Sequence, residues 1–186
     1  MKKSGIIILI FFSSVLIMAV QKNNTEKPML SNNSLNADST AVDSSIVDSE
    51  FVKKPFDLDT LTINNLRKLY SKFFSIKKEP IQNVHVKNQT DTLVTVRIKN
   101  SDFIFYRIPG QEFLESATIK DPLIKLSRNI TIGMTAEQFK SRFEQLKQSQ
   151  QLPPTLTVSG EEGDGYVVFT FDKKRLIKVE FFGYLD

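Results

Sequence analysis

Apolar residues recur with helical spacing in two segments of the chain. In the second of them, Phe139, Phe143 and Leu146 follow Thr135 at intervals of three or four residues, which places them on one face of a helix. Thr135 is followed three residues later by a glutamine, the spacing of a capping box, in which two residues bond reciprocally at a helix start. The pattern therefore predicts an amphipathic helix that starts at Thr135 and ends before the two prolines of residues 153–154.

The earlier helical segment starts at Thr62 and has the same character. Its apolar stripe is formed by four residues, Ile63, Leu66, Tyr70 and Phe73. The stripe predicts a helix from Thr62 to about Phe74.

Elsewhere apolar and polar residues alternate, as they do in half-buried strands. This alternation predicts strands at residues 83–87, 91–99, 103–108, 113–120, 155–159, 165–172 and 176–182. Three-residue turns at 100–102 and 173–175 pair Val94 with Ile108 and Val167 with Phe181. Both hairpins then have one apolar face, as an antiparallel sheet packed on helices requires.

Five residues recur 73 positions apart without a gap. They are Thr62, Pro80, Asp91, Val94 and Ile104, which match Thr135, Pro153, Asp164, Val167 and Ile177. A strand that slips by one residue turns every side chain to the other face, so matching alternation indicates a repeated unit. We therefore expect an α+β fold of two pseudo-repeats, each an amphipathic helix packed on an antiparallel sheet, at about residues 51–121 and 122–186.

The first fifty residues have the composition of a leader. Lys2 and Lys3 precede an apolar run over residues 6–20, which is typical of an export signal. The run is short for a membrane span, which needs about 20 residues. We expect residues 1–20 to be an export signal, with an uncleaved N-terminal anchor as the alternative, and the protein to be periplasmic or secreted. Membrane contact then depends on retention of this segment.

Residues 21–50 are rich in Asn, Ser, Asp and Thr and contain no aromatic residue. Such a segment buries too little apolar surface to offset its conformational entropy, which predicts a disordered polar tether. Residues 51–186 then form a single domain.

Composition excludes several classes of protein. The net charge of +4 is small, and short basic runs such as 53–54, 77–78 and 173–175 are scattered rather than gathered on one segment. Nucleic-acid-binding proteins usually concentrate their basic residues, so no nucleic-acid partner is expected. The chain has no cysteine, which excludes a lipidated N-terminal cysteine and a cysteine nucleophile.

The strand parity also predicts what the helix-distal face of the sheet carries. The candidate partner-binding residues on that face are Arg97, Phe103, Phe105, Arg107, Tyr166, Leu176 and Phe182. Aromatic residues and arginine are enriched at the energetic centres of protein interfaces. The alternative is that the tether, residues 51–56 or a second copy covers this face, since large exposed apolar patches are uncommon on monomers.

Residues 130–139, Ile-Thr-Ile-Gly-Met-Thr-Ala-Glu-Gln-Phe, carry a resemblance to a known group of proteins. Together with the alternating strands up to Phe181, they resemble exported modules that include the β-lactamase inhibitory protein and the small lipoprotein of the outer-membrane barrel-assembly machine. The resemblance implies helices against an antiparallel sheet and a role in binding other proteins. The lipidated cysteine of the barrel-assembly lipoprotein has no counterpart here.

Residues suited to catalysis or metal binding are sparse. His85 is the only histidine and has no partners at ligand spacing. Residues 159–165 combine three carboxylates with three glycines, but they lack the alternating ligands of an EF-hand and are equally typical of a turn. No phosphate-binding glycine loop or serine nucleophile motif is present. We therefore expect no enzyme, no cofactor and no metal.

Three functions remain open from the sequence. The first is an exported, non-catalytic module, such as an inhibitor, a scaffold or an accessory of envelope assembly, that binds another protein of the envelope or exterior through the aromatic and arginine-containing sheet face. The second is a binder of a small ligand or envelope polymer, with a pocket between helices and sheet. The third is a hydrolase whose carboxylates meet only in the folded chain.

Overall fold

The computed structural model describes residues 45–58, 60–83, 86–161 and 165–183. The predicted export signal and most of the predicted tether lie outside this range. The folded part begins before the predicted boundary at residue 51, because Ser45–Val47 already form a strand. Within the described residues, no helix has the length and apolar character needed to cross a membrane.

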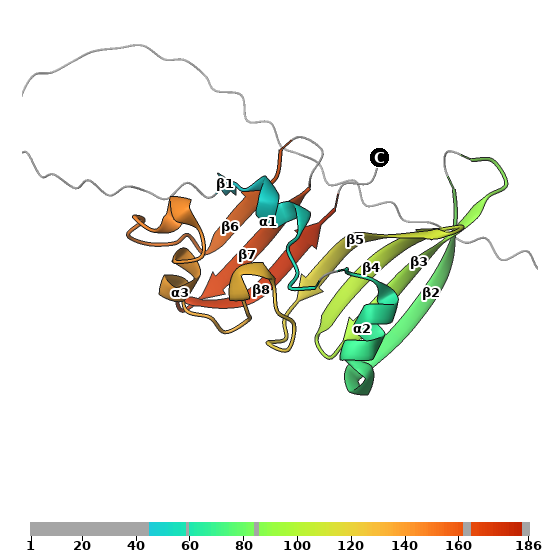
Figure 1. Ribbon diagram of the computed structural model, residues 1–186, viewed down its shortest axis with the longest axis horizontal. Coiled ribbons are helices and arrows are strands. Elements are labelled where there is room, and N and C mark those ends of the chain that lie inside the picture. The colour runs from blue at the N-terminus through green and yellow to red at the C-terminus, as the bar shows by residue number, and fades with distance from the viewer. Residues whose placement is uncertain (1–44, 59, 84–85, 162–164, 184–186) are drawn as a thin grey trace, which may run out of the picture. The chain divides into compact units, whose positions relative to one another are not determined.

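One mixed sheet of eight strands dominates the described part of the chain (Figure 1). The strands are β1 (Ser45–Val47), β2 (Phe74–Gln82), β3 (Thr90–Ile98), β4 (Ser101–Ile108), β5 (Gln111–Ile119), β6 (Thr155–Ser159), β7 (Tyr166–Asp172) and β8 (Arg175–Phe182). Their order is β1-β6-β7-β8-β5-β4-β3-β2. All pairs are antiparallel except β1 with β6, which is parallel. Of the predicted strand 83–87, residues 83, 86 and 87 are not in a strand and residues 84–85 lie outside the described residues, whereas the first long strand lies earlier, at β2. The other predicted strands are present.

The predicted fold class is wrong. Instead of two pseudo-repeats, each with an amphipathic helix on its own antiparallel sheet, the two hairpin groups share one sheet through the pairing of β5 with β8. The α-helices are short: α1 (Ser49–Lys53), α2 (Ile63–Leu69) and α3 (Ala136–Lys140). Three 3₁₀ turns accompany them, η1 (Ser71–Phe73), η2 (Ser127–Asn129) and η3 (Glu144–Leu146).

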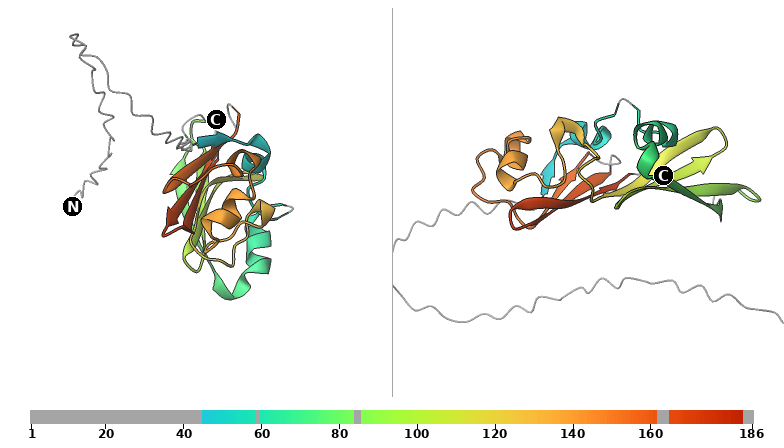
Figure 2. Two further views of the ribbon diagram at one scale, coloured as in Figure 1. Left: turned by 90° about the vertical axis from the view of Figure 1, so that its left-hand side faces the viewer. Right: turned by 90° about the horizontal axis from the view of Figure 1, so that it is seen from below.

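The helices lie on one side of the sheet, and the right-hand view of Figure 2 shows this layer edge-on. We call the helix-covered face of the sheet the inner face and the opposite face the outer face. The inner-face side chains Val96 of β3 and Phe169 of β7 have no solvent exposure. The strand parity predicted for these two strands is therefore confirmed.

The helix predicted at Thr135 starts where expected but is shorter. Thr135 and Gln138 form the predicted capping box, with both hydrogen bonds present. The helix ends at Lys140 because the Ser141 hydroxyl donates to the Gln138 carbonyl, a local bond that competes with continued helix, and Phe143 is extended. The predicted stripe of Phe139, Phe143 and Leu146 is nevertheless buried, since a turn and η3 bring the last two back to the core.

Phenylalanine rings fill the space between the inner face and the helices. The Phe169 ring centroid lies 4.8 Å from that of Phe139 and 5.9 Å from that of Phe51. Phe56 packs against Phe103 in the other half of the sheet, with centroids 5.5 Å apart. Phe51, Val52 and Phe56 are thus part of the core. Residues 51–56 therefore do not cover the outer face, which was one of the alternatives considered from the sequence.

The first long hairpin has a different register from the predicted one. Ile98 pairs with Ser101, so the turn contains two residues, of which Lys99 has a φ of 51°. Val94 consequently pairs with Phe105 rather than with Ile108, and the parity of β4 is reversed. The second long hairpin has the predicted pairing of Val167 with Phe181.

A clasp joins the N-terminal segment to the rest of the fold. The Asp48 carboxylate accepts from the Phe51 amide and from both terminal nitrogens of Arg128, at 2.6 and 3.0 Å. The Arg128 guanidinium also lies over the rings of Phe51 and Phe143. Burial acts to raise the pKa of Asp48, but the hydrogen bonds from Arg128 and from the Phe51 amide lower it overall. The clasp therefore holds β1 and α1 with an ionised carboxylate.

Gly165 occupies a position that a side chain does not fit. Its φ is +84°, and a Cβ there would lie 2.3 Å from the Phe182 carbonyl oxygen. We expect Gly165→Ala to lower the free energy of unfolding by about 2–4 kcal/mol, from the left-handed backbone and from overpacking. Gly110→Ala is the matched control, because Gly110 has a φ of +81° with nothing within 4 Å of its Cβ position. Urea denaturation would compare the two variants, and equal losses would contradict the steric part of this prediction.

Candidate functional site

The outer face is the broadest surface that the fold leaves for a partner. Strand pairing places one row of outward side chains across seven strands: Lys77, Thr95, Ile104, Ser116, Phe182, Tyr166 and Ser159. A neighbouring row continues over four strands with Glu79, Leu93, Tyr106 and Phe113. In the part of the chain that the structure describes, no helix covers these rows.

Apolar and aromatic residues gather in these two rows. We call them the outer patch, and they are Leu93, Ile104, Tyr106, Phe113, Tyr166 and Phe182. Phe113, Tyr166 and Phe182 are 41%, 42% and 36% exposed, whereas the others are half-buried. Tyr166 and Phe182 are direct cross-strand neighbours whose rings stack with centroids 4.8 Å apart. Such a pair holds two large rings in place before any partner arrives.

Three ion pairs lie on the outer face, while the carboxylate of Glu115, which acts on Tyr106, has one oxygen without a hydrogen-bond partner among the described residues. Arg97 donates two hydrogen bonds to the Asp102 carboxylate, at 2.7 and 2.9 Å. Lys178 lies 2.8 Å from Glu180, and Lys77 lies 2.9 Å from Glu79. The face thus presents apolar surface between ion pairs, with no excess of unpaired cations shown, a composition closer to a protein interface than to a polyanion-binding surface.

A polar cluster fixes one end of the outer patch. Asp91 is 1% exposed and accepts from the Tyr106 hydroxyl, from Gln89 at 2.8 Å and from Asn83 at 2.6 Å. The Tyr106 hydrogen bond, with those of the two amides, holds the pKa of Asp91 below its usual range, while burial acts in the opposite direction. The same bond raises the pKa of Tyr106. The cluster anchors the loop between β2 and β3 and fixes the Tyr106 ring on the outer face.

The structure places three of the seven predicted site residues on the outer face: Arg97, Tyr166 and Phe182. The positions predicted for Phe103, Phe105 and Leu176 are wrong, because all three are fully buried. Phe103 and Phe105 point inward since the two-residue turn shifts the register of β4. Leu176 points inward because Ile177 is an extra, bulged residue of β8. The bulge shifts the alternation of the strand, so the predicted parity holds only for the residues that follow Ile177.

Arg107 also lies on the other face. It contacts Glu112 at 2.7 Å, and the second Glu112 oxygen accepts from the Ile63 amide at the start of α2. The arginine therefore orients a carboxylate at a helix start on the inner side. Its predicted position on the helix-distal face is wrong for the same reason as that of Phe105, the reversed parity of β4.

Leu93, Ile104, Tyr106 and Phe113 are outer-patch residues that the sequence prediction missed. Residues 103–106 are all apolar or aromatic, so hydrophobicity alone assigns no face to them. The length of the hairpin turn could have assigned the outward residues of β4, because a two-residue loop at 99–100 reverses the parity of this strand.

The described residues contain no group of three or more His, Asp or Glu side chains arranged to hold a metal ion. His85 and residues 162–164, the centre of the acidic glycine-rich loop, lie outside the described residues. Comparisons of the chain with protein-family models, with curated proteins and with solved structures find no match.

Proposed function

We propose that the protein is an exported, non-catalytic module that binds another protein of the cell envelope or exterior through the outer face. The observation that carries the proposal is the outer patch, which has the exposed and stacked Tyr166–Phe182 pair at its β7–β8 end. Aromatic side chains supply large buried area at low ordering cost, and single interface anchors contribute about 2 kcal/mol or more.

The arrangement of the face supports binding rather than catalysis. Its arginine Arg97 is paired with Asp102 within the chain, so a partner need not bring an opposite charge for it. Strand pairing makes the outer face a preformed platform, which lowers the entropic cost of binding. Occlusion of a partner's surface, or assembly of two partners, follows from such a platform without bond chemistry.

The leader supports an extracytoplasmic location. Two lysines followed by an apolar run have the order of an export signal, and a polar stretch follows them. The resemblance of residues 130–181 to exported binding modules is consistent with this place of action. Full-length protein recovered from the soluble cytoplasmic fraction of the source cells would contradict export.

The test of the proposed function is the double variant Tyr166→Ser/Phe182→Ser, with Leu123→Ser as its matched control. Leu123 is 40% exposed, close to the exposure of the two aromatic residues, and its carbonyl faces Tyr70 away from the outer patch. Chemical cross-linking in cells of the source organism, followed by capture and mass spectrometry, should detect a partner with wild type and with Leu123→Ser. We expect the double variant to lose about 90% of that partner, since two anchors contribute more than a tenfold change in affinity.

Two results would contradict the proposal. The first is a partner retained by the double variant at wild-type level while the variant's melting temperature is unchanged. The second is a wild-type protein that cross-links only to itself and becomes monomeric in the double variant, as light scattering after size-exclusion chromatography would reveal. In that case the outer face is an interface between copies.

A further inference from the structure

Lysines that lie far apart in the sequence come together at one end of the strands β2 to β5. Strand pairing places the start of β2 beside the end of β3, and the start of β4 beside the end of β5. Three segments therefore share this end: η1 before β2, the turn between β3 and β4, and the residues that follow β5 (Figure 1). Each of them carries an exposed lysine, and these are Lys72, Lys99 and Lys120.

Side-chain contacts join the three segments. The Lys99 ammonium lies 4.6 Å from the ring centroid of Phe73 in η1 and 3.8 Å from the Asp121 carboxylate. The Ser101 hydroxyl accepts from the amides of Lys120 and Asp121, at 3.0 and 3.1 Å, so the start of β4 holds the segment that follows β5. The basic end, as we call this surface, consists of Lys72, Phe73, Lys99 and Lys120.

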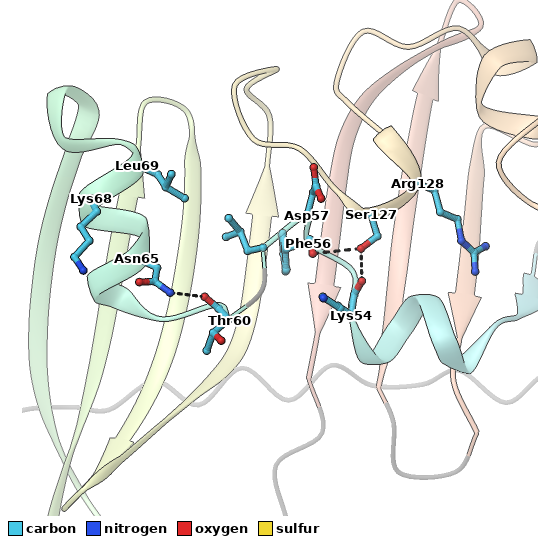
Figure 3. A pocket seen from close by; sticks show the side chains of 10 residues that line it. Lys54, Phe56, Asp57, Thr60, Asn65, Lys68, Leu69, Ser127 and Arg128 are labelled. Carbon is cyan, nitrogen blue, oxygen red and sulfur yellow. Dashed lines mark hydrogen bonds between the residues drawn. The ribbon is translucent and has the colours of Figure 1, made fainter.

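The helix α2 fixes the position of η1. Figure 3 shows the start of α2, where the Asn65 side chain donates to the Thr60 carbonyl at 2.8 Å. Leu66 anchors the helix in the core with no solvent exposure. The Tyr70 amide donates to the Leu66 carbonyl, and the Phe73 amide donates to the Tyr70 carbonyl at 2.8 Å. The segment that carries Phe73 therefore continues from the helix by hydrogen bonds and has a defined direction.

The basic end presents cations to solvent and keeps a carboxylate beneath them. The side chain of Asp121 is only 8% exposed and contributes little to the surface that a partner meets. Asp102, at the start of β4, is engaged by two hydrogen bonds from Arg97. Lys72 and Lys120 take part in no ion pair among the described residues. A partner of this surface is therefore expected to be anionic.

Phe73 adds an apolar group to the basic end. Its side chain is 45% exposed although it is one of the largest apolar residues, and the Lys99 ammonium lies over its ring. Aromatic rings beside cations suit the surface of a bilayer, where the ring lies at the level of the headgroups and the ammonium groups meet phosphates. A soluble polyanion would contact the lysines and leave the ring in water, whereas an anionic membrane contacts both.

We propose that the basic end docks on a membrane surface that contains anionic phospholipid, with Phe73 among the headgroups and its three lysines against their phosphates. The attraction acts over about 10 Å at 0.1 M salt, so these exposed lysines contribute only once the surfaces are close. The contact belongs to the folded part of the chain and does not require the N-terminal segment on which membrane contact was expected to depend. The outer patch lies on a face of the sheet rather than at the strand ends, so both surfaces can be occupied together.

Cosedimentation with sucrose-loaded vesicles tests the proposal. The chain from residue 21 is used, because the apolar run of residues 6–20 would insert into any bilayer, and this chain contains every residue that the structure describes. Its far-UV circular dichroism should match that of the full chain in its strand content. We expect it to bind mixed vesicles of phosphatidylcholine and phosphatidylglycerol about tenfold more tightly than phosphatidylcholine vesicles, and less tightly as salt is raised.

Two variants with the same change in net charge separate the basic end from the charge of the whole molecule. Lys72→Glu/Lys120→Glu should weaken binding to the mixed vesicles about tenfold or more, since two attractive charges become repulsive. Lys78→Glu/Lys87→Glu is the matched control, because Lys78 lies within β2 and Lys87 beyond its far end, and it should lose about twofold or less. Phe73→Ser should weaken binding about fivefold while the salt dependence stays as in wild type.

Four results would overturn the proposal. They are the absence of binding to the mixed vesicles, equal binding to both kinds of vesicle, equal losses in the two double lysine variants, and wild-type binding by Phe73→Ser. Retention on immobilised poly-glutamate without binding to vesicles would overturn it as well and would assign the basic end to an acidic protein. Tyr166→Ser/Phe182→Ser should bind the vesicles like wild type, and a loss in that variant would place the lipid contact on the outer face instead.

Discussion

Replacing Phe105 with alanine is expected to lower the free energy of unfolding by about 3–5 kcal/mol, the range for truncation of a buried phenylalanine. Phe105 has no solvent exposure and lies on the inner face opposite Val94. Truncation removes a ring from a packed core, and the surrounding chain can fill the resulting cavity only in part. Urea denaturation monitored by circular dichroism would measure the loss.

Phe113→Ala is the control for this prediction, because Phe113 is 41% exposed on the outer face of the neighbouring strand. Its loss should be about 1 kcal/mol or less, as for most surface substitutions. The comparison tests the register of the β3–β4 hairpin directly. With a three-residue turn, Phe105 would face solvent, and Phe105→Ala would leave the denaturation midpoint almost unchanged.

Phe169→Ala is expected to cost a similar amount, about 3–5 kcal/mol. Its ring contacts those of Phe51, Phe139 and Phe143, which come from α1, from α3 and from the turn before η3. The substitution therefore loosens the inner layer from the sheet as well as opening a cavity. Urea denaturation of this variant, monitored by circular dichroism at two wavelengths, would measure the loss. A denaturation midpoint near that of wild type would show that these rings do not form the core.

Thr170→Ala provides the comparison for Phe169→Ala at the next position of the same strand. Thr170 is half-buried on the outer side, and its replacement loses only strand propensity, about 1 kcal/mol. Equal losses for the two variants would indicate an effect on β7 as a strand rather than on the ring cluster.

Local patterns in the sequence predict the elements whose signals are themselves local. The capping box at Thr135 depends on residues three positions apart and forms as predicted. At the predicted start of the earlier helix, Thr62 likewise accepts from the amide of Asn65. The alternation in β3 and β7 predicts their buried sides, since one side of each strand is consistently apolar.

The register of β4 could not be predicted from local patterns of this kind. Its residues Phe103, Ile104, Phe105 and Tyr106 are apolar on both sides, because both faces of this strand serve a purpose: the inner side builds the core and the outer side forms the outer patch. Hydrophobicity alone therefore assigns no face, and the turn at Lys99 decides. Three candidate site residues of the first hairpin changed sides with this single turn.

The joining of the two hairpin groups in one sheet could not be predicted from the sequence either. Pairing of β5 with β8 joins segments about sixty residues apart, and no local pattern encodes a contact at that separation. The outer patch extends over both halves only because of this pairing, which brings Ser116 beside Phe182 and so connects Ile104 with the Tyr166–Phe182 pair.

The strand β1 also bears on how the molecule avoids sticking to its own copies. A sheet ends in two rows of unpaired peptide groups, which can recruit strands from other chains and start aggregation. On one side the last strand is β2, where two lysines, a glutamate and Pro80 make strand addition unfavourable. On the other side β6 is shielded by Ser45–Val47, held down through Asp48 and Arg128. A protease that removes the leader together with Ser45–Val47 would thus expose the edge of β6 to strand addition by other chains. Removal of the first twenty residues alone leaves β1 paired with β6.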